Sequence, residues 1–409
     1  MPAAPLDGSP VPDDGALPAS ATAAFGSQPF GIYVHVPFCT TRCGYCDFNT
    51  YTATELLSRD GTASATLGGY PKLAMGELGL ARNVLGEGPP VSTVFVGGGT
   101  PTLLAPERLG DILATIDQTF GLSADAEVTT EANPETVDRD YLLRLRAAGF
   151  TRVSFGMQSA RPRVLHILER THTPGRPQQC AAWAREAGFD HVNLDLIYGT
   201  PGESDDDWRA SVTAALEAAP DHISAYSLIV EQGTRLAGRV RRGELDPPDE
   251  DALADRYVLA DDLLSTAGYH WYEVSNWARS PSGRSRHNQL YWTGGDWWGI
   301  GPGSHSHVGG TRWWNVKHPA AYAQRLAAGR SPADAREVLS VEEQHLERVL
   351  LELRLANGLP LAVLDPQGQH RAHDVAARGL LDAQQLAAGR AVLTRTGRLL
   401  ADAVVRELT

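Results

Sequence analysis

Residues 32–46 read IYVHVPFCTTRCGYC, and this stretch decides the fold. It opens with β-branched and aromatic residues, the pattern of a short strand. It then runs directly into a loop that holds three of the chain's four cysteines, Cys39, Cys43 and Cys46. We therefore predict a strand over 32–36 with three thiols at its carboxyl end. This close spacing is typical of a metal site and unlike a disulfide framework.

Short apolar runs alternate with helix-length amphipathic segments along the residues that follow. We expect further strands over 94–96, 127–130, 152–155, 191–197 and 222–230. We expect helices over 71–85, 105–119, 134–148, 177–187 and 205–218. The alternation predicts an α/β fold with a parallel sheet, namely a partial (β/α)6 barrel of the TIM-like type. Sites in such folds lie at the carboxyl ends of the strands.

The composition divides the chain into four segments. Residues 1–27 lack apolar periodicity and are expected to form a flexible tail, and 28–260 hold the predicted barrel. Residues 261–335 contain seven of the nine tryptophans, which favours an irregular, aromatic-rich extension. Residues 336–409 begin with a capping-box pattern at Ser340 and are expected to form a small helical or winged-helix-like module.

The overall charge argues against a nucleic-acid partner. The chain has 36 basic and 49 acidic residues, a formal net charge of −13, whereas phosphate recognition needs clustered lysine and arginine. There is no apolar run of about 18 residues, and no lysine or arginine precedes Arg42. We therefore expect a cytoplasmic protein, with contact to a membrane surface and homodimer formation left open.

The three thiols suit an iron-sulfur cluster. A cubane cluster normally takes four protein ligands, so three cysteines leave one iron open to a substrate or cofactor. The alternative is a structural zinc site completed by His35 or by the distant Cys180, in a protein that binds partners and catalyses nothing.

The Cys-x3-Cys-x2-Cys loop after a strand, with Tyr45 before the last cysteine, resembles the signature of the radical S-adenosylmethionine (SAM) family. The resemblance implies that Cys39, Cys43 and Cys46 hold a [4Fe-4S] cluster. It also implies that S-adenosylmethionine binds the open iron and is cleaved after one-electron reduction. A separate low-potential electron donor would supply that electron.

Polar residues and glycines follow the other predicted strands. Gly97, Gly98 and Gly99 precede Thr100 after the second strand, where bare backbone can approach a ligand closely or simply form a tight turn. Further candidates lie at or near later strand ends: Glu131, Gln158, Arg170 and Asp195. Carboxylates can hold ribose hydroxyls or an ammonium group, and Arg170 can pair with a carboxylate. The alternative is that Glu131 and Asp195 are capping or solvated rim charges.

The strings around these residues look like those of one radical SAM subfamily, over about residues 29–400. It comprises the oxygen-independent coproporphyrinogen III oxidases and their heme chaperone paralogues. The resemblance implies cofactor contacts at nine positions: Tyr33, Tyr45, Gly98, Gly99, Thr100, Glu131, Gln158, Arg170 and Asp195.

Two features favour the chaperone branch. The oxidases have a further cysteine two residues after the third, where this chain has Phe48. The string HNQLYW at 287–292 matches a His-Asn-x-x-Tyr-Trp motif associated with heme binding, so His287 is the candidate heme ligand. The alternative is that His287 is a hydrogen-bonded loop residue that does not bind heme. We therefore expect a protein that binds heme and passes it to recipient proteins. The runner-up is an oxidase that decarboxylates coproporphyrinogen III.

Overall fold

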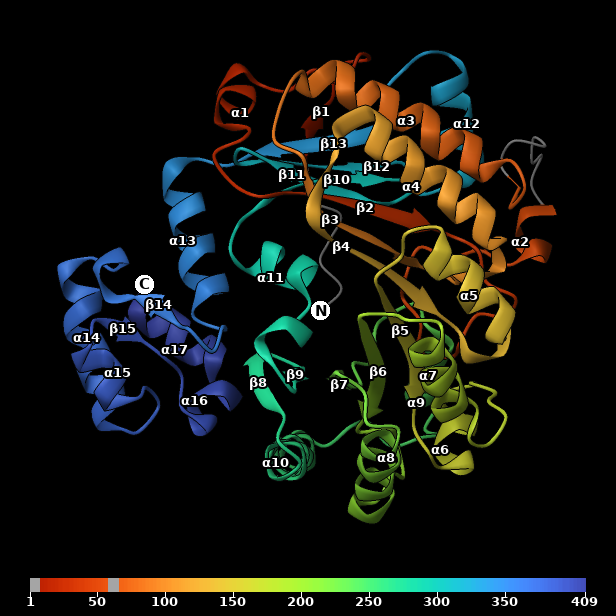
Figure 1. Cartoon of the computed structure of the whole chain (residues 1–409). Coiled ribbons are helices and arrows are strands. Elements are labelled where there is room, and N and C mark those ends of the chain that lie inside the picture. Colours follow the sequence, from red (N-terminus) through yellow and green to blue (C-terminus); the bar gives the residue numbers. More distant parts are fainter. Residues whose placement is uncertain (1–7, 58–65) are drawn as a thin grey trace.

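A curved sheet of six parallel strands forms the centre of the molecule (Figure 1). The structure is a computed structural model, which describes residues 8–57 and 66–409. The six strands lie side by side in chain order, and each is parallel to its neighbours. They are β2 (Phe30–Val36), β3 (Val91–Gly98), β4 (Leu122–Ala132), β5 (Arg152–Gln158), β6 (His191–Tyr198) and β7 (His222–Ser227). The predicted α/β fold and partial (β/α)6 barrel are confirmed.

The alternation of side chains along each strand separates an outer apolar face from a more polar interior. In β2, Ile32, Val34 and Val36 are fully buried in the main hydrophobic core. The residues between them, Tyr33 and His35, belong to the opposite face, because successive side chains of a strand point to opposite sides. The inside of the barrel is therefore lined with groups that can form hydrogen bonds.

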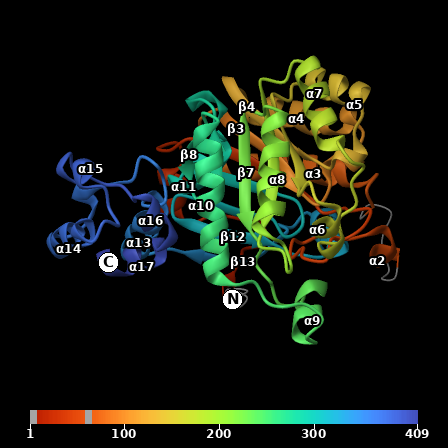
Figure 2. The ribbon, with the colours of Figure 1, turned by 90° about the horizontal axis from the view of Figure 1, so that it is seen from below.

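Helices cover the outer face (Figures 1 and 2). They are α3 (Tyr70–Leu85), α4 (Pro106–Phe120), α5 (Arg139–Ala147), α7 (Arg176–Glu186), α8 (Asp205–Glu217) and α10 (Glu250–Thr266). The helix expected over 134–148 is shorter than predicted. The side chain of Asn133 caps a separate 3-10 turn, Pro134–Thr136, and that of Asp138 then caps α5, so each asparagine or aspartate starts its own turn.

Strands on both sides extend the barrel into one mixed sheet, which has thirteen strands in the described part of the chain. Next to β2 lie β10 (Asp296–Ile300), β11 (His305–Val308), β12 (Thr311–Asn315) and β13 (Ala333–Val338), and next to β7 lie β9 (Asn276–Ala278) and β8 (His270–Glu273). The expectation of an irregular extension over 261–335 is therefore wrong. Its tryptophans pack within strands, as Trp298 and Trp313 do at 4.7 Å between ring centroids.

The N-terminal segment also belongs to the folded body. β1 (Ser9–Pro10) pairs with β13, the short helix α1 (Ala19–Ala24) buries Ala21, and the amide of Ser331 donates to the carbonyl of Asp13. The expected flexible tail is thus wrong for residues 8–27, while residues 1–7 lie outside the described residues. The segment covers the open edge of β13, which reduces the unpaired backbone there.

The C-terminal residues form a small module with its own hydrophobic core (Figure 2). Its helices are α13 (Val341–Glu352), α14 (Pro366–Ala377), α15 (Ala383–Ala387), α16 (Arg395–Leu399) and α17 (Ala401–Leu408), with a two-stranded sheet of β14 (Leu359–Pro360) and β15 (Arg390–Ala391). The capping box predicted at Ser340 is present, with Glu343 as its second member.

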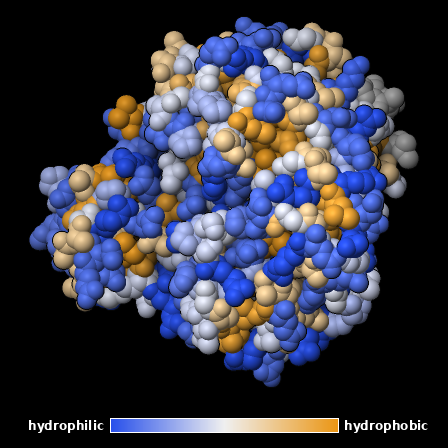
Figure 3. All heavy atoms as spheres, in the orientation of Figure 1, coloured by the Kyte–Doolittle hydropathy of each residue, from blue (hydrophilic) through white to orange (hydrophobic). Residues whose placement is uncertain are grey.

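The exterior is mixed in character. On the face shown in Figure 3, hydrophobic residues lie in small groups separated by hydrophilic ones. None of the helices in the described ranges combines the length and the hydropathy needed to cross a bilayer.

Candidate cofactor site at the carboxyl ends of the barrel strands

The cysteine loop begins directly after β2 and is held as a closed turn. The amide of Cys39 donates to the carbonyl of Tyr51 at 3.0 Å, and the amide of Tyr51 donates to Pro37 at 2.7 Å. The amide of Gly44 donates to Leu168 at 3.1 Å, which anchors the middle of the loop to the segment after β5. All three thiols are half-buried and line one pocket.

That pocket has a volume of about 730 Å³ and lies where the barrel strands end. Its lining includes eleven of the thirteen residues expected at the site: Cys39, Cys43, Tyr45, Cys46, Gly98, Gly99, Thr100, Glu131, Gln158, Arg170 and Asp195. The structure therefore brings together residues that are up to 156 positions apart, because the carboxyl ends of parallel strands share one edge.

The glycines at the end of β3, Gly97 and Gly98, and Gly99 directly after it allow this strand to approach the cysteine loop. Gly98 has φ of +107°, and a Cβ there would lie 2.5 Å from the ring of His35. A Cβ on Gly99 would lie 2.5 Å from the carbonyl oxygen of Phe38. The amides of Gly99 and Thr100 donate to Val36 and Phe38, at 2.8 and 2.7 Å. The glycines therefore serve the close approach of backbone to backbone, and any larger residue would displace the loop.

Two buried carboxyl groups face the same pocket. Glu131 accepts a hydrogen bond from the amide of Gly98 at 3.0 Å, and Asp195 accepts bonds from Ser154 at 2.7 Å and Asn193 at 2.8 Å. Burial, followed by repulsion from Asp195, raises the pKa of Glu131 to about 7, and burial also raises the pKa of Asp195. A cationic ligand in the pocket would relieve both effects.

Arg170 connects the cysteine loop to the end of β5. Its guanidinium donates to Sγ of Cys43 at 3.6 Å and to the carbonyl of Gly156 at 3.2 Å, while its Nε donates to Nε2 of His172 at 3.3 Å. A Cβ on Gly156 would lie 2.9 Å from the guanidinium, so glycine leaves room for this bridge. The charge of Arg170 therefore lies beside a thiol that would ligate iron as thiolate.

Gln158 lies in a conformation that non-glycine residues seldom adopt. Its φ is +64°, and the pairing of β5 with β6 shifts register between Gly156 and Gln158. Backbone strain of this kind is concentrated at functional sites. Gln158 pairs with Leu196 as the last residue of the β5–β6 ladder, and it lines the pocket.

Sequence reasoning missed several residues that line the pocket or hold a lining residue in position. Ser154 and Asn193 hold Asp195 in position, and Tyr226 lines the pocket from the end of β7. The sequence signal that could have found them is the two-residue alternation of side chains along a strand. Asn193 and Asp195 share a face of β6, so a polar residue two positions before a site residue also points inward.

Two of the expected site residues do not line the pocket. The hydroxyl of Tyr33 is 2.9 Å from Nδ1 of His35, whose Nε2 is 2.9 Å from the carbonyl oxygen of Asn49. The ring of Tyr33 is stacked on that of Phe95, with the two ring centroids 6.2 Å apart. Tyr33 thus lies inside the barrel, where its hydroxyl contacts His35, and His35 in turn contacts the backbone at Asn49, just after the cysteine loop.

The second is His287, which is fully buried in the short helix α11 (Arg286–Trp292). Its Nδ1 is 2.8 Å from the hydroxyl of Thr93 on β3, and its Nε2 is 2.8 Å from the hydroxyl of Tyr291. Burial lowers the pKa of His287 to about 3. Both ring nitrogens are thus engaged, as the hydrogen-bonded alternative expected, and an axial bond to heme would have to replace one of these contacts.

The other residues of the His-Asn-x-x-Tyr-Trp motif also make internal contacts. Side-chain hydrogen bonds from Asn288 and Trp292 reach the buried carboxyl group of Glu273, whose pKa burial raises to about 7. The amide of His287 donates to Glu127 at 3.1 Å, and Glu127 pairs with buried Arg152 at 3.7 Å. In this structure the motif closes the amino end of the barrel.

The thiols are not arranged around a single point. Within the described residues, no group of three His, Cys, Asp or Glu side chains could hold one metal ion. A cluster bonds each thiolate to a different iron, so its ligands need not converge. Three half-buried thiols on one loop therefore suit the ligand set of a cluster.

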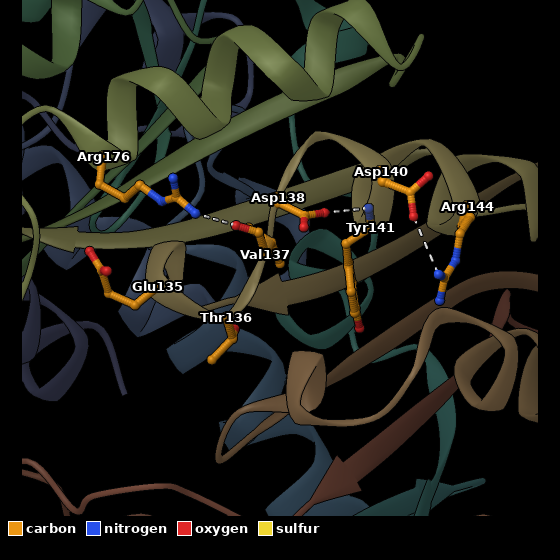
Figure 4. Close-up of a pocket in the computed structure, with 8 residues that line it drawn as sticks. All are labelled: Glu135, Thr136, Val137, Asp138, Asp140, Tyr141, Arg144 and Arg176. Carbon is orange, nitrogen blue, oxygen red and sulfur yellow. Dashed lines mark hydrogen bonds and ion pairs between the residues drawn. The ribbon is translucent and has the colours of Figure 1, made fainter.

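A second, smaller hollow of about 280 Å³ lies beside α5 (Figure 4). Its charged groups are used by the chain itself. Asp138 caps α5, Arg176 donates to the carbonyl of Val137 at 2.7 Å, and Arg144 pairs with Asp140 at 3.3 Å. We assign no ligand to it.

The chain is similar to known proteins over most of its length. The family model of the Radical SAM superfamily matches residues 33–215, which include the cysteine loop. The heme chaperone HemW of Mycobacterium tuberculosis (strain H37Rv) is 56% identical over 383 residues, which cover 93% of this chain and 95% of that protein. The chain belongs to the radical SAM superfamily and, within it, to the HemW family.

More distant members of this superfamily align over similar lengths. The heme chaperone HemW of Bacillus subtilis (strain 168) is 32% identical over 381 residues, 91% of this chain and 97% of that protein. The solved structure of coproporphyrinogen III oxidase (HemN) from Escherichia coli, a radical SAM enzyme, covers 95% of this chain and 92% of its own with a TM-score of 0.78. At 23% identity, the oxidase shows a shared fold and no more.

Proposed function

We propose that this radical SAM protein is a heme chaperone, which binds heme and transfers it to recipient proteins. The observation that carries the proposal is the 56% identity to the HemW of M. tuberculosis, which extends over almost the whole of both chains. The chain also has Phe48 where the resemblance to the oxidases would require a further cysteine.

The pocket fits the two cofactors that the superfamily implies. Cys39, Cys43 and Cys46 would hold the [4Fe-4S] cluster, with Arg170 beside Cys43 to stabilise its thiolate. Glu131 and Asp195 would hold cationic parts of S-adenosylmethionine, because two buried carboxyl groups without a cation repel each other. When bound, the pair supplies reductive cleavage of S-adenosylmethionine to a 5'-deoxyadenosyl radical.

Other residues expected at this cofactor would act through contact or shape. Gln158, Tyr45 and Thr100 would contact it from the pocket wall, and Gly98 and Gly99 would present backbone to it. Tyr33 would act indirectly, through His35 and Asn49. His287 stays a candidate heme ligand only for a conformation in which the amino end of the barrel opens.

The remaining parts of the proposal concern partners and location. A low-potential electron donor would reduce the cluster, and the acceptors of heme would be heme proteins. We place the protein in the cytoplasm, because thiols that hold a cluster must stay reduced and reducing compartments keep thiols in that state. A homodimer is compatible with the proposal and is not required by it.

The proposal is tested with cluster-reconstituted protein under anaerobic conditions. Hemin is titrated into the protein, and the complex is mixed with apomyoglobin as a heme acceptor. Conversion of coproporphyrinogen III is assayed on the same preparation with S-adenosylmethionine and a chemical reductant. We expect saturable hemin binding, transfer to apomyoglobin and no conversion. Conversion of coproporphyrinogen III that depends on S-adenosylmethionine would overturn the proposal and favour the oxidase. The absence of hemin binding would also overturn the proposal.

A further inference from the structure

Three large apolar side chains are exposed at the mouth of the cofactor pocket. Phe48 follows the cysteine loop and is 59% exposed, Tyr226 ends β7 and is 42% exposed, and Ile229 follows β7 and is 63% exposed. They come from opposite sides of the pocket, one from the loop after the first barrel strand and two from the end of the last. Exposed apolar groups at a cavity mouth are typical of a ligand-binding surface.

The wall behind these three side chains is strongly acidic. Arg170 is the one guanidinium among the described lining residues, against six carboxyl groups: Asp47, Glu131, Glu135, Glu169, Asp195 and Glu231. Glu169 also pairs with Arg235 at 2.7 Å, which leaves five carboxyl groups without an arginine partner outside the pocket in the described part of the chain. Arg170 is already committed to Cys43 and to the carbonyl of Gly156. The wall suits a cofactor that brings cationic groups and disfavours a ligand whose carboxylates have no cation beside them.

This wall discriminates between porphyrins by the distribution of their carboxylates. Heme has propionates on two neighbouring rings and vinyl groups on the other two, so one edge of the macrocycle has no carboxylate. Coproporphyrins have a propionate on each of the four rings, so every edge would bring a carboxylate to the acidic wall. The flat apolar faces of either macrocycle could pack on Phe48 and Tyr226.

The described residues that line the pocket include no histidine or methionine, the commonest neutral ligands of heme iron. Its cysteines are the expected ligands of the cluster, and the ring of Tyr226 would pack on the macrocycle. Binding at the mouth would therefore depend on the faces and edges of the macrocycle and not on its metal.

We propose that heme enters the pocket mouth by its vinyl-bearing edge, between Phe48 on one side and Tyr226 and Ile229 on the other, with both propionates in solvent. This inference rests on the proposed function, and it assigns the heme to the open end of the barrel instead of to His287. It makes Phe48, Tyr226 and Ile229 the residues that bind the macrocycle, and the acidic wall the feature that determines which porphyrin is accepted.

The test compares four porphyrins on cluster-reconstituted protein loaded with S-adenosylmethionine. Dissociation constants are measured for hemin, zinc protoporphyrin, metal-free protoporphyrin IX and coproporphyrin III. We expect the first three to agree within about threefold, because no axial bond contributes. Coproporphyrin III should bind at least about tenfold more weakly, because one of its carboxylates must face the acidic wall.

Variants of the mouth complete the test. Ile229→Ser, and the double variant Phe48→Ser/Ile229→Ser, should each weaken hemin and protoporphyrin IX in parallel, the double variant by about tenfold or more. Val341→Ser is the matched control, because Val341 is also an exposed apolar residue, at 77%, but lies on α13, away from the pocket. Iron content and thermal melting establish that each variant keeps its cluster and its fold.

The outcomes separate this inference from the function on which it rests. If the wild-type protein does not bind hemin, both fail. If it binds hemin but ignores protoporphyrin IX, or binds coproporphyrin III equally well, the docking at the mouth is wrong and the heme chaperone stands. Unchanged hemin affinity in the double variant would also overturn the inference alone.

Discussion

The two ends of one barrel use similar residues for opposite purposes. At the carboxyl end, Glu131 and Asp195 line an open pocket of about 730 Å³. At the amino end, Glu127 and Arg152 pair with each other, and α11 covers them. The same strands, β4 and β5, supply groups to both ends.

The difference shows that polarity inside a barrel does not by itself identify a site. His287 has the residue type and the motif of a ligand, yet both its ring nitrogens are bound within the chain. Glu131 has one backbone partner and a raised pKa, which are the marks of a group that awaits a ligand. Partner groups, more than residue types, distinguish the open end from the closed one.

The largest effect that would sharpen this comparison is expected at the cysteine loop. Cys43→Ala should abolish cluster assembly, since the cluster keeps only two protein ligands. Cys180→Ala is the matched control, because Cys180 is buried in α7 with Sγ 3.5 Å from the carbonyl of Pro134, outside the pocket. The measurement is iron and sulfide per chain after anaerobic reconstitution. Full iron content in the Cys43 variant would show that this cysteine is not a ligand.

A large loss of stability is expected at the closed end. Arg152→Ala leaves the buried carboxylate of Glu127 without its cation, and both side chains are at most 5% exposed. Removing one partner of such a pair costs about 3–5 kcal/mol of unfolding free energy. Arg108→Ala, which breaks an exposed pair with Asp111, should cost less than about 1 kcal/mol. Urea denaturation measures the unfolding free energy of both variants. Equal losses would show that the pair of Glu127 and Arg152 at the amino end of the barrel does not behave as a buried ion pair.

The barrel was predictable from the sequence because its signals are local. Each parallel strand contains a short run of apolar or β-branched residues, and four of the helices match the expected ranges within one residue at each end. The pocket followed from the rule that sites lie at strand ends, which placed Glu131, Gln158 and Asp195 correctly on its wall.

The parts that were not predictable depend on contacts between distant residues. Thr93 and His287 are 194 positions apart, so nothing near His287 showed that its nitrogens would be occupied. β1 is ordered by pairing with β13, more than 300 positions away, and β10 by pairing with β2. Tryptophan and glycine around 271–314 hid the strands of the extension, because the partners that bury those strands lie in other segments.

The pH dependence of stability offers a finer measure of the closed end. The pKa of His287 is about 3 in the folded protein, against 6.5 for an exposed histidine. Only the unfolded chain therefore takes up a proton at this residue between pH 6.5 and 3, so its contribution to stability is present above pH 6.5 and is lost as the pH falls.

The matched variant is His287→Gln, which keeps hydrogen-bonding capacity toward Thr93 and Tyr291 but does not titrate. Between pH 7 and pH 5, the unfolding free energy of the wild type should fall by about 2 kcal/mol more than that of the variant. Urea denaturation at the two pH values measures the difference. A parallel fall in both proteins would mean that His287 is already accessible to protons in the folded state. The amino end of the barrel would then open readily, and His287 would again be a candidate heme ligand.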